Sequence, residues 1–132
     1  MIIQTKAATL ERKDNGVLEI RFKEHVKLTV DGVQEVLDAR MELCGRGPYA
    51  VLVTLPDDID FEIAVLAKDH YDGRGLEDCT YAVAWDTGSE MNEKLVDIFY
   101  RYFPQPFPVK TFPSEEEARA WLDKKMAEEA KE

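Results

Sequence analysis

Three aspartates that could hold a metal ion, Asp57, Asp58 and Asp60, follow an apolar run at residues 50–55. Carboxylate oxygens are the ligands that Mg²⁺ prefers, and ligands of open α/β sheets bind at the carboxyl ends of strands. Such a site would also need an acidic pair after the first long strand, but residues 22–24 are Phe-Lys-Glu. We therefore favour a helix cap and a solvated turn, and predict neither a metal ion nor a cofactor.

Two cysteines and two histidines, Cys44, Cys79, His25 and His70, are the other possible metal ligands. Their spacing matches no short-range zinc pair. Two cysteines are too few for a disulfide framework, so we expect both to be reduced, as in a cytoplasmic protein. The sequence shows no glycine-rich phosphate loop and no supported Ser-His-Asp or Cys-His arrangement, so we predict that the protein is not an enzyme.

Arg40 is a charged residue inside an apolar helical stripe. In the helix predicted over residues 31–44, it lies one or two turns from Val33, Val36, Leu37 and Cys44. A charge in this position must extend to solvent or find a partner. Arg40 could bind an anion or a partner, but we favour a structural ion pair with an acidic side chain, or a cap on nearby backbone carbonyls. If Arg40 is buried, Arg40→Ala would cost about 3 kcal/mol. We treat Arg40, Phe61 and the three aspartates as a candidate ligand or ion-pair site.

The helix predicted over residues 89–103 is apolar on two sides. The sheet is expected to bury one stripe, made of Met91, Leu95, Ile98, Phe99 and Tyr102. The other stripe is made of Val96, Tyr100 and Phe103, with Phe107 following in a proline-rich loop. Either this loop folds back over the second stripe, or the stripe is a contact surface, because aromatic residues are favoured in interface cores. The second alternative predicts a homodimer.

The positions of these residues depend on an alternating order of strands and helices. An Asp-Asn-Gly turn at residues 14–16 predicts a hairpin, and alternating strands and helices after it predict a mostly parallel sheet with right-handed crossovers. The predicted strands cover residues 7–12, 17–23, 50–55, 80–85 and 109–112. The predicted helices cover about 31–44, 60–71 and 89–103, with a fourth that begins after Ser114.

The chain of 132 residues has the size of one domain, and we assign residues 1–132 to it, with a frayed charged tail at about 127–132. Its 27 acidic and 17 basic residues give a net charge of −10. This charge repels phosphate backbones and anionic membranes, so we predict no nucleic-acid partner. No apolar run approaches the length of a transmembrane helix.

The order ββαβαβαβα resembles the STAS domain, the fold of SpoIIAA-like anti-sigma-factor antagonists. Residues 39–52, 106–112 and 114–122 are similar to an uncharacterised SpoIIAA-like branch of small bacterial proteins. The resemblance implies a five-stranded mixed sheet with an antiparallel first strand and four helices. Phosphorylatable STAS domains carry an Asp-Ser pair where Asp60-Phe61 stands here, so this chain lacks the phosphorylatable serine.

The resemblance implies a non-enzymatic regulatory or protein-interaction domain, which is our leading interpretation of function. The alternative is a domain that binds a small apolar ligand or a lipid. Its pocket would lie between the second and third predicted helices.

Overall fold

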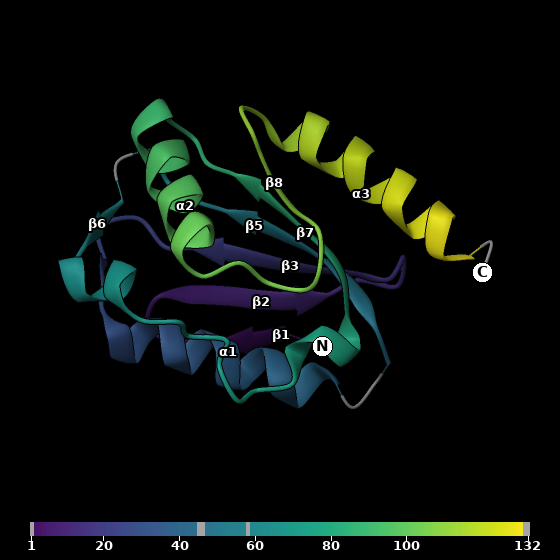
Figure 1. The fold of residues 1–132 in the computed structure, drawn as a ribbon, viewed down its shortest axis with the longest axis horizontal. Helices are drawn as coiled ribbons and strands as arrows, with labels where there is room; N and C mark the ends of the chain where they lie inside the picture. The colour runs from purple at the N-terminus through teal and green to yellow at the C-terminus, as the bar shows by residue number, and fades with distance from the viewer. Residues whose placement is uncertain (1, 45–46, 58, 131–132) are drawn as a thin grey trace.

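A six-stranded sheet forms the centre of the molecule in this computed structural model, which describes residues 2–44, 47–57 and 59–130 (Figure 1). In spatial order the strands are β1 (Ile2–Gln4), β2 (Ala8–Arg12), β3 (Val17–Phe22), β5 (Tyr49–Thr54), β7 (Thr80–Asp86) and β8 (Val109–Phe112). Strands β1, β2 and β3 pair antiparallel, whereas β3, β5, β7 and β8 run parallel. The predicted mixed α/β class is therefore confirmed.

The hairpin between β2 and β3 turns at the predicted Asp-Asn-Gly sequence. Gly16 has a φ of +88°, which glycine adopts without steric cost. The side-chain oxygen of Asn15 accepts a hydrogen bond from the backbone N–H of Val17 at 3.1 Å. This turn sets the register in which β2 pairs with β3.

Three α-helices accompany the sheet: α1 (Val30–Cys44), α2 (Glu90–Tyr102) and α3 (Glu115–Ala130). Each begins at a hydroxyl cap, as the backbone N–H groups of a first turn require. Thr29 caps α1 by accepting from the N–H of Gly32 at 3.0 Å, and Ser89 caps α2. Ser114 caps α3 at the predicted start of the last helix, and its hydroxyl also lies 3.3 Å from the Glu117 carboxylate.

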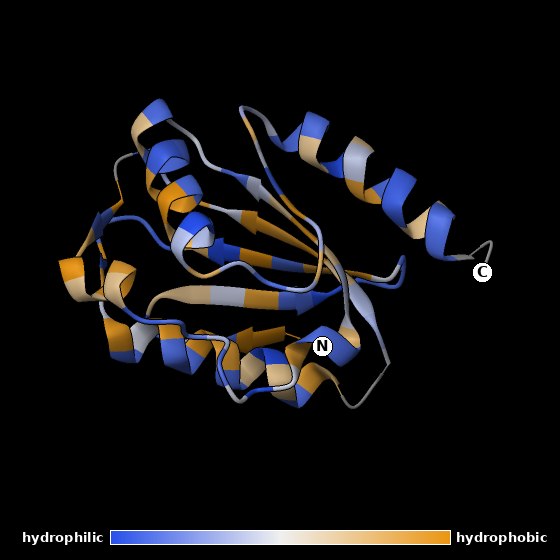
Figure 2. Ribbon diagram, in the orientation of Figure 1, coloured by the Kyte–Doolittle hydropathy of each residue, from blue (hydrophilic) through white to orange (hydrophobic). Residues whose placement is uncertain are grey.

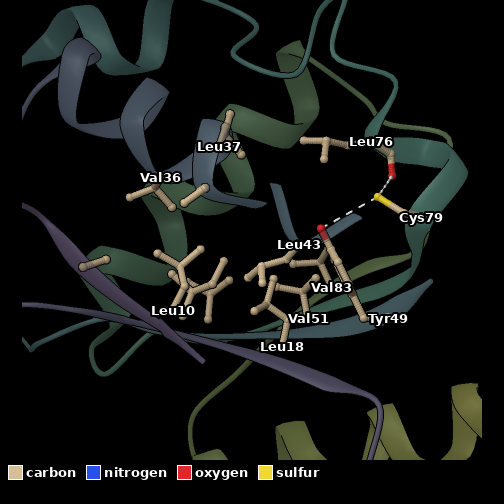
Figure 3. Packing of buried hydrophobic residues seen from close by; sticks show 14 of the residues in the cluster. Leu10, Leu18, Val36, Leu37, Leu43, Tyr49, Val51, Leu76, Cys79 and Val83 are labelled. Carbon is tan, nitrogen blue, oxygen red and sulfur yellow. Dashed lines mark hydrogen bonds between the residues drawn. The ribbon is translucent and has the colours of Figure 1, made fainter. Parts of the chain in front are cut away.

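Helix α1 covers one face of the sheet and builds the larger core there. Leu37 and Leu43 of α1 pack in one cluster with Leu18 and Val51 of the sheet (Figure 3). Helix α2 lies over the same face beside β7 and β8 (Figure 1). Side chains of α1 and α2 line a cavity between these helices and the sheet. The face under α1 and α2 is therefore the one that positions a site.

Helix α3 covers the opposite face. Ala118 and Leu122 pack against alternate residues of β5 and β7, while much of the outer surface of α3 is hydrophilic (Figure 2). Near its start, Arg119 forms ion pairs with Glu19 at 3.0 Å and with Glu115 at 3.1 Å. Glu19 is only 7% exposed, so this charge is compensated where β3 meets α3.

The predicted count of five strands and four helices needs two corrections. Strand β1 adds an antiparallel edge that the sequence did not predict. The helix predicted over residues 60–71 is absent: β6 (Asp60–Phe61) pairs parallel with β4 (Lys27–Leu28), and the 3₁₀ helix η1 (Ile63–Ala67) follows. A second 3₁₀ helix, η2 (Leu76–Cys79), precedes β7. A short apolar run does not distinguish a helix from a strand by its period.

Cys44 and Cys79 form a disulfide, with their Cα atoms 5.7 Å apart. The expectation that both cysteines are reduced is therefore wrong for this structure. They are the last residues of α1 and η2. The hydroxyl of Tyr49 lies 3.5 Å from Cys44 Sγ and 3.7 Å from Cys79 Sγ, which Figure 3 shows beside it. The fold, and not local spacing, brings them together across 35 positions.

The tail predicted to fray, about 127–132, lies partly in α3, which continues to Ala130; residues 131–132 lie outside the described residues. Across the described chain, no helix combines the length and the hydrophobicity that crossing a bilayer would require.

Candidate functional site

A cavity of about 130 Å³ lies between the sheet and three segments that cover it: α1, α2 and residues 59–71. Ile20, Val53 and Val83, from β3, β5 and β7, form its apolar floor. These strands are parallel neighbours, so side chains that alternate along each of them share one face of the sheet. Residues 59–71, which form a short strand and a 3₁₀ helix, supply six of the lining side chains: Ile59, Phe61, Val65, Leu66, His70 and Tyr71.

Arg40 projects from α1 into this lining and is 1% exposed. One guanidinium nitrogen, Nη2, donates to the hydroxyl of Thr80 at 2.7 Å. The guanidinium also lies over the rings of Tyr49 and Tyr71, at 5.7 Å and 5.9 Å from their centroids. Its Nε has no hydrogen-bond partner, and no carboxylate among the described residues pairs with it. The predicted structural ion pair is therefore wrong.

Further polar groups surround the cavity near Arg40. The hydroxyls of Tyr71 and Tyr100 share a hydrogen bond at 2.7 Å, and the ring of Trp85 meets that of Tyr100 at 6.0 Å. Burial raises the pKa of Tyr100 well above its usual value, and the neighbouring Tyr71 raises it further, so Tyr100 stays protonated at neutral pH. Two buried nitrogens, Trp85 Nε1 and His70 Nδ1, have no partner among the described residues, while His70 Nε2 lies 2.8 Å from the carbonyl of Val65.

Asn92 closes the end of the cavity next to the carboxyl ends of β5 and β7. It is 2% exposed, and its amide nitrogen donates to the carbonyls of Pro56 and Thr87, at 2.7 Å each. These bonds tie the loops after two strands to the first turn of α2. Asn92 therefore fixes how far α2 stands from the sheet.

Half-buried apolar side chains line the cavity on its outer side. Phe61 and Leu66 come from residues 59–71, and Leu95 and Phe99 come from α2. Because each of them is also in contact with solvent, the cavity reaches the surface between these two segments. A small molecule could enter there without passing the buried Arg40.

The second stripe of α2 faces inward and not outward. Val96 and Phe107 are 8% and 6% exposed, Val96 and Tyr100 line the cavity, and the ring of Phe107 packs against Tyr71 at 5.6 Å. Phe103 is half-buried against Phe99. Of the two alternatives for this stripe, the structure has the one in which it is covered from within, so the contact surface predicted at these residues is not exposed.

The other stripe of α2, expected to be buried, carries the exposed side chains instead. Met91, Ile98 and Tyr102 are 66%, 39% and 72% exposed. Leu95 and Phe99 of the same stripe line the cavity and are half-buried, so this stripe is exposed only in part. Both stripes are apolar, and only the packing against the sheet distinguishes them. No sequence signal separated the two faces.

The predicted ligand or ion-pair site is divided by the structure. Arg40 and Phe61 both line the cavity, whereas Asp57 and Asp60 are exposed and do not. Asp58 lies outside the described residues. Within the described chain, no three acidic, histidine or cysteine side chains are grouped as metal ligands.

The histidines and cysteines also separate. His25 is exposed at the turn before β4, whereas His70 is 4% exposed and lines the cavity. The disulfide lies beside the cavity and not in it: Cys44 is one turn after Arg40 in α1, and Cys79 directly precedes Thr80. It therefore links the two segments that hold the Arg40–Thr80 hydrogen bond.

Comparisons with known proteins agree with this fold. The sequence profile of a family described as Domain of unknown function (DUF7793) matches residues 11–126. A crystal structure of an uncharacterized protein of the DUF3478 family from Shewanella loihica PV-4, which has a SpoIIAA-like fold, is similar at a TM-score of 0.59 and 18% identity. The match covers 88% of this chain and 92% of that chain, so the fold is SpoIIAA-like. No curated protein matches.

Proposed function

Since the chain belongs to the DUF7793 family and has a SpoIIAA-like fold, we propose its function from its own cavity: it is a non-enzymatic binding domain for a small, mostly apolar molecule. The observation that carries this proposal is a cavity of about 130 Å³ whose lining is largely apolar yet contains a buried, unpaired arginine. Ligand pockets commonly combine an apolar wall with a few polar groups that orient the ligand.

A packing defect would have a different composition. A cavity without a function is expected to be apolar throughout, because buried polar groups without partners cost free energy. Here three such nitrogens, on Arg40, His70 and Trp85, belong to side chains that line the same cavity. Their presence around one cavity supports a binding site. A regulatory role would follow if binding changed the position of α2 or of residues 59–71.

Binding is tested with toluene, a neutral apolar probe, by nuclear magnetic resonance of the indole N–H groups. The chain has two tryptophans. Trp85 lines the cavity, whereas Trp121 packs against Phe112 on the opposite face of the sheet. We expect saturable shifts of the Trp85 signal and none of the Trp121 signal.

A variant that fills the cavity provides the control. Val96→Phe places a larger side chain in the lining of the cavity, whereas Ile98→Phe adds a ring to the exposed side of the same helix. Binding should be lost in the first variant and kept in the second. Toluene that leaves the Trp85 signal unchanged, or that binds both variants equally, would contradict the proposal.

A second candidate function, protein association, is favoured by the exposed stripe of α2. Met91, Ile98 and Tyr102 form an apolar strip on its outer side, and such residues are typical of interface cores. A homodimer through this strip would replace the interface first expected at Tyr100, Phe103 and Phe107. Light scattering should then show a dimer that Tyr102→Glu dissociates; a monomer at micromolar concentrations would contradict it.

A further inference from the structure

We propose that the ligand of this cavity is a small monocarboxylate with an apolar body about the size of one ring, and that its carboxylate pairs with the guanidinium of Arg40. This inference rests on the proposed binding function and adds the chemical class of the ligand. It depends on the sign of the charge in the cavity, on the kind of hydrogen-bonding groups without partners, and on the volume.

The charge in the cavity is positive and uncompensated. Arg40 is 1% exposed, and a guanidinium stays protonated in proteins. No aspartate or glutamate is among the described residues that line the cavity, and only a neutral hydroxyl and two aromatic rings contact the guanidinium. Because an isolated buried charge is costly, a ligand that brings one negative charge gains an interaction that a neutral ligand lacks.

Two of the unpaired groups can only donate. Arg40 Nε and Trp85 Nε1 each carry an N–H and have no lone pair to accept with. Trp85 Nε1 already has the hydroxyl of Tyr100 beside it as an acceptor, so Arg40 is the donor that gains from a ligand, and an ionised carboxylate offers it two acceptor oxygens. Arginine and carboxylate also match in planar geometry, which favours two parallel hydrogen bonds. An amine ligand would satisfy neither donor.

The volume limits the apolar part of the ligand. The cavity measures about 130 Å³, and an engineered cavity of about 150 Å³ lined by apolar side chains takes up benzene. Phe99, Trp85 and Val83 offer apolar and aromatic surface to such a ring. The apolar part of the ligand is therefore no larger than one ring, and a phenyl ring with an acid side chain must extend in part toward the opening between α2 and residues 59–71.

The net charge of −10 opposes the binding of any anion at long range. Salt screens this repulsion beyond about 8 Å at physiological ionic strength, whereas contact with Arg40 occurs inside the cavity, where screening is weak. The overall charge of the protein therefore slows the entry of an anion into the cavity, but it does not remove the attraction between the anion and Arg40 once the anion is inside.

Matched probes separate the charge from the apolar body. Phenylacetate and 2-phenylacetamide have nearly the same shape, and only the first is an anion. We expect phenylacetate to shift the Trp85 indole signal with an affinity at least about tenfold higher than that of the amide, a difference typical of one added charged contact. Trp121, on the far face of the sheet, should not respond.

Arg40→Gln should abolish this preference, because glutamine keeps hydrogen bonding and lacks the charge. Arg101→Gln removes one positive charge from the exposed side of α2 and should keep the preference. If Arg40→Gln does not fold, the comparison of phenylacetate with benzylamine on the native protein replaces it, and the amine should not bind.

The outcomes separate this inference from the proposed function. Equal affinity for acid and amide, or an unchanged preference in Arg40→Gln, would overturn the carboxylate inference while toluene binding still supported an apolar site. Binding of neither probe would also overturn it, and if toluene fails as well, the proposed function fails with it. Tighter binding of benzylamine would show that the charge in the cavity has been assigned the wrong sign.

Discussion

Replacing Arg40 with methionine should leave the domain at least as stable as the native protein. Methionine is unbranched and apolar and reaches about as far as the Nε of arginine, so it fills the path of the side-chain stem and leaves only the space of the guanidinium group. The change leaves no new unpaired group behind, because the hydroxyl of Thr80 still donates to the carbonyl of Leu76 at 2.6 Å. This differs from the loss of one partner of a buried ion pair, which would leave the other charge unpaired.

The size of the effect follows from the contacts of Arg40. The variant loses one hydrogen bond of a charged group, which contributes about 1.5–3 kcal/mol, and two aromatic contacts of about 0.5–1 kcal/mol each. The variant no longer buries an uncompensated ion, which costs the native protein several kcal/mol of stability. It also lacks the unpaired Nε donor, which costs about 1–3 kcal/mol. We therefore expect Arg40→Met to be more stable by about 1–2 kcal/mol, within the range seen when buried charges are replaced by apolar groups.

Urea unfolding followed by circular dichroism measures this difference. Arg40→Ala is the control for packing, because it also removes the side-chain stem and should be less stable than Arg40→Met by about 2–3 kcal/mol. A loss of more than about 2 kcal/mol in Arg40→Met would refute the reasoning, since it would mean that Arg40 has a structural partner that stabilises the fold.

Three further predictions concern the residues around the cavity and the opposite face. Asn92→Ala should lower the free energy of unfolding by about 2–3 kcal/mol in urea, because two buried carbonyls lose their short hydrogen bonds; a loss below about 1 kcal/mol would show that water replaces the amide. Reduction of the disulfide between Cys44 and Cys79 should cost about 4 kcal/mol, because it frees a loop of 35 positions in the unfolded chain. A double alanine variant of the two cysteines should be insensitive to dithiothreitol, and equal stability of the native protein with and without this reductant would argue against the disulfide. Burial raises the pKa of Glu115, but hydrogen bonds and charges from Arg119 and a second arginine outweigh it and leave the pKa lowered. Glu115 therefore contributes stability that is present above its ordinary pKa and lost as pH falls through the lowered value; Arg119→Gln should reduce this dependence in urea titrations across the acid range, and an unchanged dependence would contradict it.

The strands were predictable where the pattern of apolar residues fits a strand and no other element. The apolar run 50–55 is too short for most helices and is buried in β5, and the Asp-Asn-Gly turn fixed the hairpin before it. Strand β1 (Ile2–Gln4) was missed because three residues are too few to show an alternating pattern. An edge strand of this length depends on pairing with β2, which is tertiary information.

Residues 60–71 show the limit of periodicity more clearly. Their apolar residues fit a helix or a strand, and the structure uses a short strand and a 3₁₀ helix. The outcome depends on β4, with which β6 pairs, and on Glu62, whose carboxylate accepts from the N–H of Val30 at 2.8 Å. Contacts across more than thirty positions decide this segment, and a local pattern cannot contain them.

Besides the pocket expected between residues 60–71 and 89–103, which both line the cavity, the candidate site had one sequence signal, the charge of Arg40 within an apolar stripe. That signal was correct in location, since the stripe does face the interior, but the expected acidic partner is absent from the described residues around it. The orientation of α2 was the missing information, because Tyr100 and Val96 complete the cavity only if their stripe faces inward. A sequence with two apolar stripes on one helix does not determine which of them the sheet covers.

The position of Arg40 also separates stability from function in this fold. A side chain selected only for stability would be apolar at this place, since the surrounding residues of α1 and the sheet are apolar and the cavity has no acidic wall among the described residues. Where a native sequence places a residue that is unfavourable for stability at a buried position, that position is expected to belong to a functional site. Arg40→Met is expected to be more stable than the native protein and unable to distinguish phenylacetate from its amide. Both results together would show that the arginine is present for binding. Its charge lowers the stability of the unliganded domain, and only a ligand that carries the opposite charge into the cavity compensates it.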